Sequence, residues 1–234
     1  RRPQANRARE RPFAAGGRGC AVGGGLQWPQ PHCGPFRRLL AHPRLGPYLT
    51  ELCGEGYRLD HQPLVIAQEQ DSEGFHLHGG PVTNDGRMNP ELQYRCFNGQ
   101  LWTSLLAFAV QLSDHGPGDG GFCIVRGSHK VNLPVPDAVA HGTATEFWEE
   151  HLYRPVTRRG DVVIWSEATV HGATPWRGAH QRRIALYRFA PPTVGYGRGY
   201  TEVPDEVKQG MRPLERAVLE PPYATRLERP LVTA

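Results

Sequence analysis

The sequence predicts a mainly-β fold, an antiparallel sandwich or jelly roll with helices at both ends. Short stretches of β-branched, aromatic and other apolar residues recur at regular intervals, separated by turn residues, which is the pattern of such folds. Gly (28) and Pro (22) make up about a fifth of the 234 residues, which favours many turns and short strands over long helices. An all-β chain of this length commonly forms one domain.

The N-terminal segment, residues 1–31, is rich in Arg, Gly, Pro and Gln and poor in apolar residues, so we expect it to be disordered. Residues 32–234 are expected to form a single domain. Much of the net charge of +4 lies in the first eighteen residues, so the remainder is close to neutral and we expect no nucleic-acid partner. A nucleic-acid-associated role would rest on this tail alone. Its arginines, set against a lone Glu10, are Arg1, Arg2, Arg7, Arg9, Arg11 and Arg18.

The cysteine pattern and the hydropathy pattern indicate a reducing compartment and no membrane. Five cysteines are an odd number without a Cys-x-x-Cys pair, which argues against a thiolate zinc site and against a disulfide framework. No run approaches eighteen apolar residues, so no transmembrane segment is expected. We therefore expect an intracellular, cytoplasmic protein. Organelle targeting stays an alternative, because the Arg-rich, acid-poor start resembles a transit peptide, although it lacks serine and a truncated end would look similar.

The elements of the first half follow from local patterns. Residues Pro35–Leu52 predict two helical pieces separated at His42-Pro43, with Gly54 as a C-terminal stop. Tyr57–Gln68 carries strand-forming residues, and Phe75–His78 is a short alternating strand ended by Gly-Gly-Pro. The polar segment Asn84–Asn98 is too long for a tight turn and is typical of a loop that shapes a binding pocket.

The second half continues with short strands. Leu101–Leu112 is continuously apolar and predicts a strand buried on both faces, with a buried helix as the alternative. Trp102 and Trp165 are expected in the core. Ser128 and His129 lie in a loop for which we weigh an active-site role against turn stabilisation. The other expected elements are strands at Phe122–Val125, Val162–Trp165 and Arg183–Phe189, and helices at Thr143–Leu152 and Pro204–Leu219.

Three histidines form a candidate metal site. In a strand, residues i and i+2 point to the same face, so His76 and His78 would both point one way and Leu77 the other. His171, on a later strand, would close the site. Imidazole suits Fe(II), Zn(II) and Cu(II) alike, and two histidines with one carboxylate are the non-heme Fe(II) oxygenase arrangement. Taken singly, each histidine is as well explained by a structural or surface role.

Two adjacent arginines begin the apolar strand near residue 183. The period of two would turn one of Arg182 and Arg183 inward and the other toward solvent. A buried guanidinium is the planar cation that binds a carboxylate through two parallel hydrogen bonds. The alternative is that both arginines are solvated charges at the start of the strand.

The second half of the chain resembles the phytanoyl-CoA dioxygenase family of Fe(II)- and 2-oxoglutarate-dependent oxygenases. The segments that carry the resemblance are DGGFCIVRGSHK (Asp119–Lys130), RGDVVIW (Arg159–Trp165), and VHGATPW with QRRIALYRFAP within Val170–Pro191. The resemblance extends from about Pro35 to Tyr223 and leaves the N-terminal tail outside it. It implies a double-stranded β-helix (jelly-roll or cupin-like) barrel with flanking α-helices.

The same resemblance implies roles for individual residues. His171 is similar to the distal iron ligand of the family, and Arg182 to the arginine that binds 2-oxoglutarate. The proximal His-x-Asp motif is not matched, because the chain offers His76-Leu77-His78 and His78-Gly79-Gly80. With His78 as the ligand, Gly80 takes the place of the carboxylate, as in iron halogenases. With His76 added, the ion would have three histidines. Carboxylates that could reach in from loops are Asp71, Glu73, Asp85 and Glu167.

The expected function is therefore a 2-oxoglutarate-dependent non-heme iron dioxygenase that hydroxylates a small organic substrate. The expected metal ligands are His78 and His171, with His76 as a third ligand, and Arg182 is expected to bind 2-oxoglutarate. Fe(II), 2-oxoglutarate and dioxygen are the implied cofactor and co-substrates. One alternative is an iron halogenase-like enzyme with a His-x-Gly site. The other is a non-catalytic barrel that acts as a binding module, which the missing acid favours.

Overall fold

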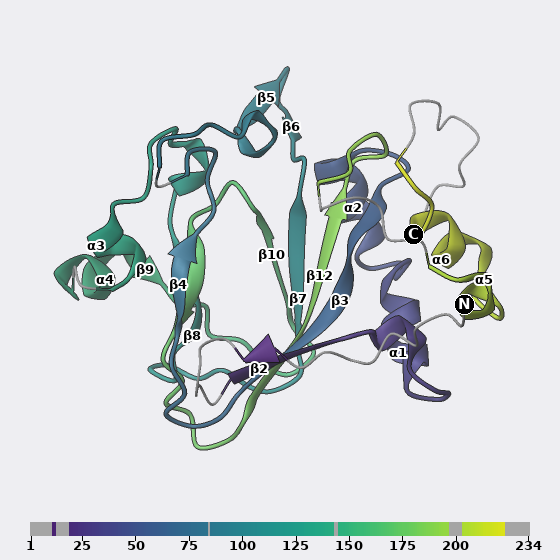
Figure 1. Ribbon diagram of the computed structural model, residues 1–234, viewed down its shortest axis with the longest axis horizontal. Helices are drawn as coiled ribbons and strands as arrows, with labels where there is room; N and C mark the ends of the chain where they lie inside the picture. Colours follow the sequence, from purple (N-terminus) through teal and green to yellow (C-terminus); the bar gives the residue numbers. More distant parts are fainter. Residues whose placement is uncertain (1–10, 13–18, 84, 143–144, 197–202, 223–234) are drawn as a thin grey trace, which may run out of the picture.

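Two antiparallel sheets face each other in the computed structural model, which describes residues 11–12, 19–83, 85–142, 145–196 and 203–222 (Figure 1). The larger sheet has the order β1-β2-β3-β12-β7-β10, and the smaller sheet has the order β4-β11-β8-β9. This is a double-stranded β-helix, as predicted. The strands of the larger sheet are β1 (Arg11–Pro12), β2 (Gly19–Gly23), β3 (Arg58–Gln68), β7 (Leu106–Gln111), β10 (Val162–Ser166) and β12 (Arg182–Ala190). Those of the smaller sheet are β4 (Phe75–His78), β8 (Gly121–Val125), β9 (Leu152–Tyr153) and β11 (His171–Thr174).

Residues on the central strands alternate between the space inside the barrel and its outer face. Along β12, every second residue from Arg182 to Arg188 lines the cavity between the sheets. On the opposite face of β12, Ala185, Tyr187 and Phe189 are buried in the core that includes the outer helices, whereas Arg183 at the start of the strand is exposed. Small Ala107 and Ala109 on β7 face the same inner space as Trp165 and Ile184, which leaves room for a cavity in the barrel.

Helices cover the outer face of each sheet (Figure 1). Leu49 and Cys53 of α2 and Val218 of α6 pack on Phe108 and Phe189 of the larger sheet. On the other side, Ala140 and Trp148 pack on Leu77, Cys123 and Leu152 of the smaller sheet. The helices are α1 (Cys33–Leu39), α2 (Gly46–Cys53), α3 (Asp137–Ala140), α4 (Thr145–His151), α5 (Asp205–Lys208) and α6 (Pro213–Val218). The short 3-10 turns are η1 (Gly25–Gln27), η2 (Pro90–Leu92) and η3 (Ser128–Lys130). None of the helices in the described part of the chain is long and apolar enough to span a bilayer.

The predicted pair of N-terminal helices is confirmed, but three other predictions were wrong. Residues 19–31 are not disordered, because β2 pairs with β3 and Leu26 is fully buried; residues 1–10 and 13–18 lie outside the described residues. The predicted C-terminal helix is two helices, since Pro213 lacks an N–H and holds the preceding Arg212 extended. Trp102 is 38% exposed rather than in the core.

Trp102 is exposed because the predicted strand Leu101–Leu112 is interrupted. Its first part, β6 (Gln100–Trp102), pairs with β5 (Arg95–Phe97) in a hairpin that projects at the top of the view in Figure 1. Its second part is β7, which is buried on both faces as predicted. The expected loop Asn84–Asn98 therefore contains η2 and one strand of this hairpin; Asn84 itself lies outside the described residues.

Candidate active site

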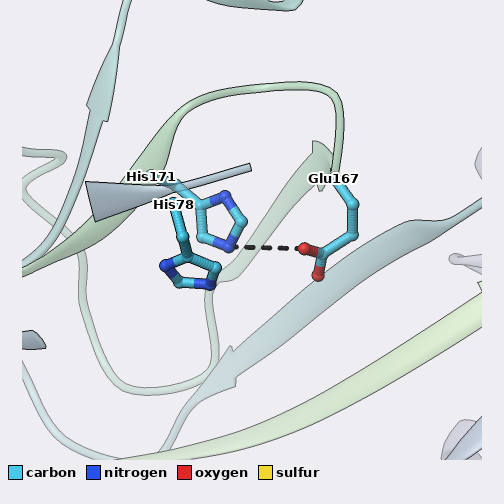
Figure 2. Close-up of side chains that lie close together, drawn as sticks. All are labelled: His78, Glu167 and His171. Atoms are coloured by element: carbon cyan, nitrogen blue, oxygen red, sulfur yellow. Dashed lines mark ion pairs between the residues drawn. The ribbon is translucent and has the colours of Figure 1, made fainter. Parts of the chain in front are cut away.

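Three side chains converge between the ends of the two sheets (Figure 2). His78 ends β4, His171 begins β11, and Glu167 lies in the turn that joins β10 to β11. Each offers one ligand atom, and these atoms all lie within 4.8 Å of one another. The Nε2 atom of His171 is 3.5 Å from Oε2 of Glu167, and the two imidazole ring centres are 4.2 Å apart. Two imidazoles and one carboxylate on one side of a point are the donor set of non-heme Fe(II) oxygenases.

Backbone carbonyls orient both imidazoles. Nδ1 of His171 lies 2.7 Å from the carbonyl oxygen of Thr169, and Nδ1 of His78 lies 3.1 Å from that of His76. A carbonyl only accepts, so in each ring Nδ1 carries the proton and donates it. Nε2 is then left with a lone pair. Metal-ligating histidines are typically held in this way by a hydrogen bond from the other ring nitrogen.

The protonation states also suit a cation. Burial lowers the pKa of His78 to about 4, helped by the nearby His171, and burial likewise lowers the pKa of His171. Burial alone would raise the pKa of Glu167, but His171 and Arg188 outweigh it and hold that pKa below its usual value. At neutral pH the site therefore presents two neutral imidazoles and one carboxylate, the forms that bind a metal ion.

His76 does not join this cluster, because β4 carries a bulge. His78 pairs with His171 and Phe75 pairs with Ala173, so β4 uses three steps where β11 uses two. The extra residue breaks the alternation, and Phe75 and His78 both line the cavity. His76 is turned to solvent and stacks on His141. The expectation that His76 and His78 share a face was wrong for this reason.

The glycines after His78 accommodate the turn that carries Glu167. A Cβ atom on Gly79 would lie 2.4 Å from the carbonyl oxygen of Thr169, and Gly79 has a φ of +102°, which favours glycine. The N–H of Gly80 donates to the carbonyl oxygen of Glu167 at 3.1 Å. Gly80, which stands where the family motif would put an aspartate, is therefore bonded through its backbone to a turn that carries a different carboxylate.

A cavity of about 250 Å³ leads from the two histidines to Arg182. Its walls are mostly apolar, and Arg182 is 2% exposed while Arg183 is exposed, as the period of two predicts. The described residues form no ion pair with Arg182. Its Nη1 donates to the neutral Oε1 of Gln68 at 2.5 Å, and its Nε has no partner in the described part of the chain. A dry guanidinium without a counter-ion is a site for an anion.

The double glycine before Phe122 makes room for this arginine. A Cβ atom on Gly121 would lie 2.8 Å from Nε of Arg182, and Gly121 has a φ of +78°. Burial lowers the pKa of Arg182 to about 10, so the guanidinium stays charged at neutral pH. Gly121, in the segment Asp119–Lys130 that carries the family resemblance, thus packs directly against the Arg182 side chain.

The other residues singled out in the sequence have structural roles around the site. The hydroxyl of Ser128 donates to the carbonyl of Val125 and accepts from the N–H of Val170, so Ser128 stabilises the turn next to His171. In the loop after β4, Nδ2 of Asn89 donates to the hydroxyl of Tyr196 at 3.1 Å. The pKa of Tyr196 is raised by burial, and the charge of Glu167 adds to this rise.

The role of Glu167 was not assigned from the sequence, where it was one of four carboxylates that could reach the site. Its position four residues before His171 was the only available signal. Asp71, Glu73 and Asp85 are all exposed, and none belongs to the cluster. Arg188, which was not singled out, holds Glu167 through a 2.8 Å contact between its Nε and Oε1.

Solved structures share this fold. HygX from Streptomyces hygroscopicus, in its crystal structure with nickel, 2-oxoglutarate and hygromycin B bound, is 24% identical, with a TM-score of 0.68 over 85% of this chain and 80% of HygX. HygX with iron bound is 25% identical, with a TM-score of 0.57 over 73% and 72% of the two chains. EctD from S. alaskensis with 2-oxoglutarate and 5-hydroxyectoine is 18% identical, with a TM-score of 0.53 over 78% and 62%.

A comparison of the sequence with family models gives a match over residues 61–184, more than half of the chain, to phytanoyl-CoA dioxygenase (PhyH). No curated protein matches the chain. The matched span contains His78, Glu167, His171 and Arg182. The chain belongs to the phytanoyl-CoA dioxygenase family of Fe(II)- and 2-oxoglutarate-dependent oxygenases.

Proposed function

We propose that this oxygenase hydroxylates a small organic molecule, with Fe(II) bound by His78, Glu167 and His171 and the far carboxylate of 2-oxoglutarate bound by Arg182. The observation that carries the proposal is the arrangement within one cavity. The two histidines lie at one end and an uncompensated buried guanidinium lies at the other. A dicarboxylic 2-oxo acid fits such a cavity because one end chelates the ion and the other pairs with the arginine.

The donor set present in the chain fits an Fe(II) ion. Bound iron would supply the activation of dioxygen, coupled to conversion of 2-oxoglutarate to succinate and carbon dioxide. The protein's part is to hold His78 and His171 with their Nε2 atoms free and to keep Glu167 ionised beside Arg188. Arg182 orients the co-substrate, and the apolar walls exclude water from the cavity.

Hydroxylation is proposed rather than halogenation. A halogenase site needs a vacancy where the carboxylate would be, but here Glu167 supplies a carboxylate within reach of both histidines. The backbone N–H of Gly80 donates to the carbonyl oxygen of Glu167, so the glycine and the carboxylate residue belong to adjoining segments. The ordered donors and the anion pocket together also favour an enzyme over a binding module.

A small polar molecule is the proposed substrate class. HygX binds hygromycin B and EctD binds 5-hydroxyectoine in their structures, and both are small molecules. A second cavity of about 230 Å³ lies beside the turn that carries Glu167, and Trp165 lines both cavities. Glu91 and Tyr94, from the loop expected to shape the pocket, line this second cavity. Dioxygen is the other proposed partner. The proposal involves neither a membrane nor a nucleic acid as a partner.

An anaerobic titration with Fe(II) and 2-oxoglutarate tests the proposal. The visible charge-transfer band of the iron–2-oxoglutarate complex would be measured for the wild type and for His78→Ala, His171→Ala, Glu167→Ala and His76→Ala. We expect the band in the wild type and in His76→Ala, and its loss in the other three variants. If the band is lost in His76→Ala and kept in Glu167→Ala, the third ligand is His76 rather than Glu167. Absence of both iron binding and the band in the wild type would overturn the proposed function.

A further inference from the structure

The partner of Arg182 is an amide, although a carboxylate would be the more common partner of a buried arginine. We propose that Gln68 is a positioning residue that fixes Arg182 while leaving its charge available for the far carboxylate of 2-oxoglutarate. The inference rests on the proposed function, because it assigns a role within the same pocket. Gln68 and Arg182 are each 2% exposed, and both line the cavity.

Gln68 is itself held in one orientation. It ends β3 and pairs with Arg182 across the β3–β12 ladder, so the two side chains leave neighbouring strands at the same level. Its Nε2 donates to the carbonyl oxygen of Glu73 at 3.1 Å. This contact turns Oε1 toward Arg182, whose Nη1 donates to it at 2.5 Å. The amide nitrogen and the amide oxygen of Gln68 therefore each have a hydrogen-bond partner, and only the oxygen, an acceptor, faces the arginine.

The groups around Arg182 leave its charge uncompensated. Burial raises the pKa of the Cys123 thiol to about 11, so no thiolate forms at neutral pH. Burial lowers the pKa of His115 to about 4, with a further contribution from Arg182, so this imidazole is neutral. A glutamate at position 68 would have nearly the shape of glutamine but would form a buried ion pair with Arg182. The choice of amide over carboxylate thus decides whether the pocket receives an anion.

The experiment compares Gln68→Glu with a matched charge change outside the pocket. Gln70→Glu is the control, because Gln70 lies two residues away and is exposed. The dissociation constant of 2-oxoglutarate would be measured by calorimetry on the Mn(II)-loaded protein. We expect an increase of at least about 100-fold for Gln68→Glu and less than about 2-fold for Gln70→Glu. Gln68→Met, which removes the hydrogen bonds without adding charge, is expected to give about 10-fold.

Pyruvate separates this role from general damage to the fold. Pyruvate has the same 2-oxo acid end but no second carboxylate, so its affinity and that of Mn(II) should be unchanged in Gln68→Glu and Gln68→Met. Equal weakening of pyruvate and 2-oxoglutarate would overturn the positioning role. Arg182→Ala completes the set: if it loses 2-oxoglutarate while Gln68→Glu and Gln68→Met keep it, the role of Gln68 is wrong and the proposed function stands. If all three bind 2-oxoglutarate normally, both proposals fail.

Discussion

Strands β12 and β4 both contribute side chains to the site, Arg182 and Arg188 from β12 and His78 from β4. The two strands differ in how regularly their side chains alternate. β12 lies inside the six-stranded sheet and pairs in continuous register with β7 from Ile184 to Phe189. Its ladder with β3 has two register shifts, and both place the extra residue on β3. Its alternation is intact, so Arg182 and Arg188 both line the cavity. β4 is the edge strand of the smaller sheet, is four residues long and carries a bulge. There, alternation predicts the wrong neighbour for His78.

The difference between an interior strand and an edge strand shows where sequence periodicity predicts correctly which side chains face a site. A residue inserted into a stretch that is paired on both sides disturbs two ladders, and on β12 the inward-facing residues follow the period of two. An edge strand has one ladder and tolerates a bulge, which re-aims side chains. In this molecule, the bulged strand lacks the expected acid, and the carboxylate comes instead from the turn before β11.

Loss of Glu167 should have the largest effect on metal affinity. If it does not, the contrast drawn between β4 and β12 is wrong. Glu167→Ala removes the only carboxylate of the cluster among the described residues, so we expect Mn(II) or Fe(II) affinity to fall by more than about 100-fold. Electron paramagnetic resonance of free Mn(II) measures this directly. Glu73→Ala is the matched control, since Glu73 is exposed, and it should bind metal as the wild type does. Equal affinities in the two variants would mean that β4 supplies its own third ligand.

Much of the fold could be predicted because its strands are short, apolar and bounded by turn residues. The predicted strands Tyr57–Gln68, Val162–Trp165 and Arg183–Phe189 each match the observed strand to within one residue at either end. Apolar continuity could not reveal that Leu101–Leu112 is interrupted after Trp102 and divided between two sheets, because a run of apolar residues carries no signal for the interruption. Residues 19–31 were assigned to disorder by composition, although a strand such as β2 needs only a few apolar residues when a neighbour is available.

The positions of the candidate side chains were predictable where one residue type and one spacing determined them. His171 and Arg182 are eleven residues apart and were chosen from the family-like motif, while the period of two predicted only that one of Arg182 and Arg183 would face inward. Glu167 could not be selected from four carboxylates. Its selection depends on the approach of the β10–β11 turn to Gly79 and Gly80, which is a contact between segments almost ninety residues apart.

Arg188→Ala should have the next largest effect. Nε of Arg188 donates to Oε1 of Glu167 at 2.8 Å, which leaves Oε2 toward His171. Loss of an interaction that orients a metal ligand typically costs about 10- to 100-fold in metal affinity, and we expect about 10-fold here because Arg188 is 20% exposed. Arg183→Ala, on the same strand but facing solvent, is the control. Weaker metal binding in Arg183→Ala would contradict the alternation of β12.

Gly121→Ala should weaken 2-oxoglutarate binding without affecting the metal. The added Cβ would lie 2.8 Å from Nε of Arg182, and the residue would be strained at a φ of +78°. We expect the dissociation constant of 2-oxoglutarate to rise by about 10-fold, from displacement of the guanidinium. Calorimetry on Mn(II)-loaded protein gives both constants. A fall in Mn(II) affinity of the same size would show that the two ends of the cavity are not independent.

His76→Ala should have the smallest effect, and it is the most direct test of the bulge on β4. If alternation held, His76 would face the ion beside His78, and its removal would cost a ligand. Because the bulge turns it to solvent against His141, we expect metal affinity to change by less than about 2-fold, and the free energy of unfolding to change by about 0.5 kcal/mol or less. Mn(II) titration and thermal unfolding measure the two quantities. A loss of metal affinity comparable to that in His78→Ala would mean that β4 straightens when the ion binds, and that the site has three histidines.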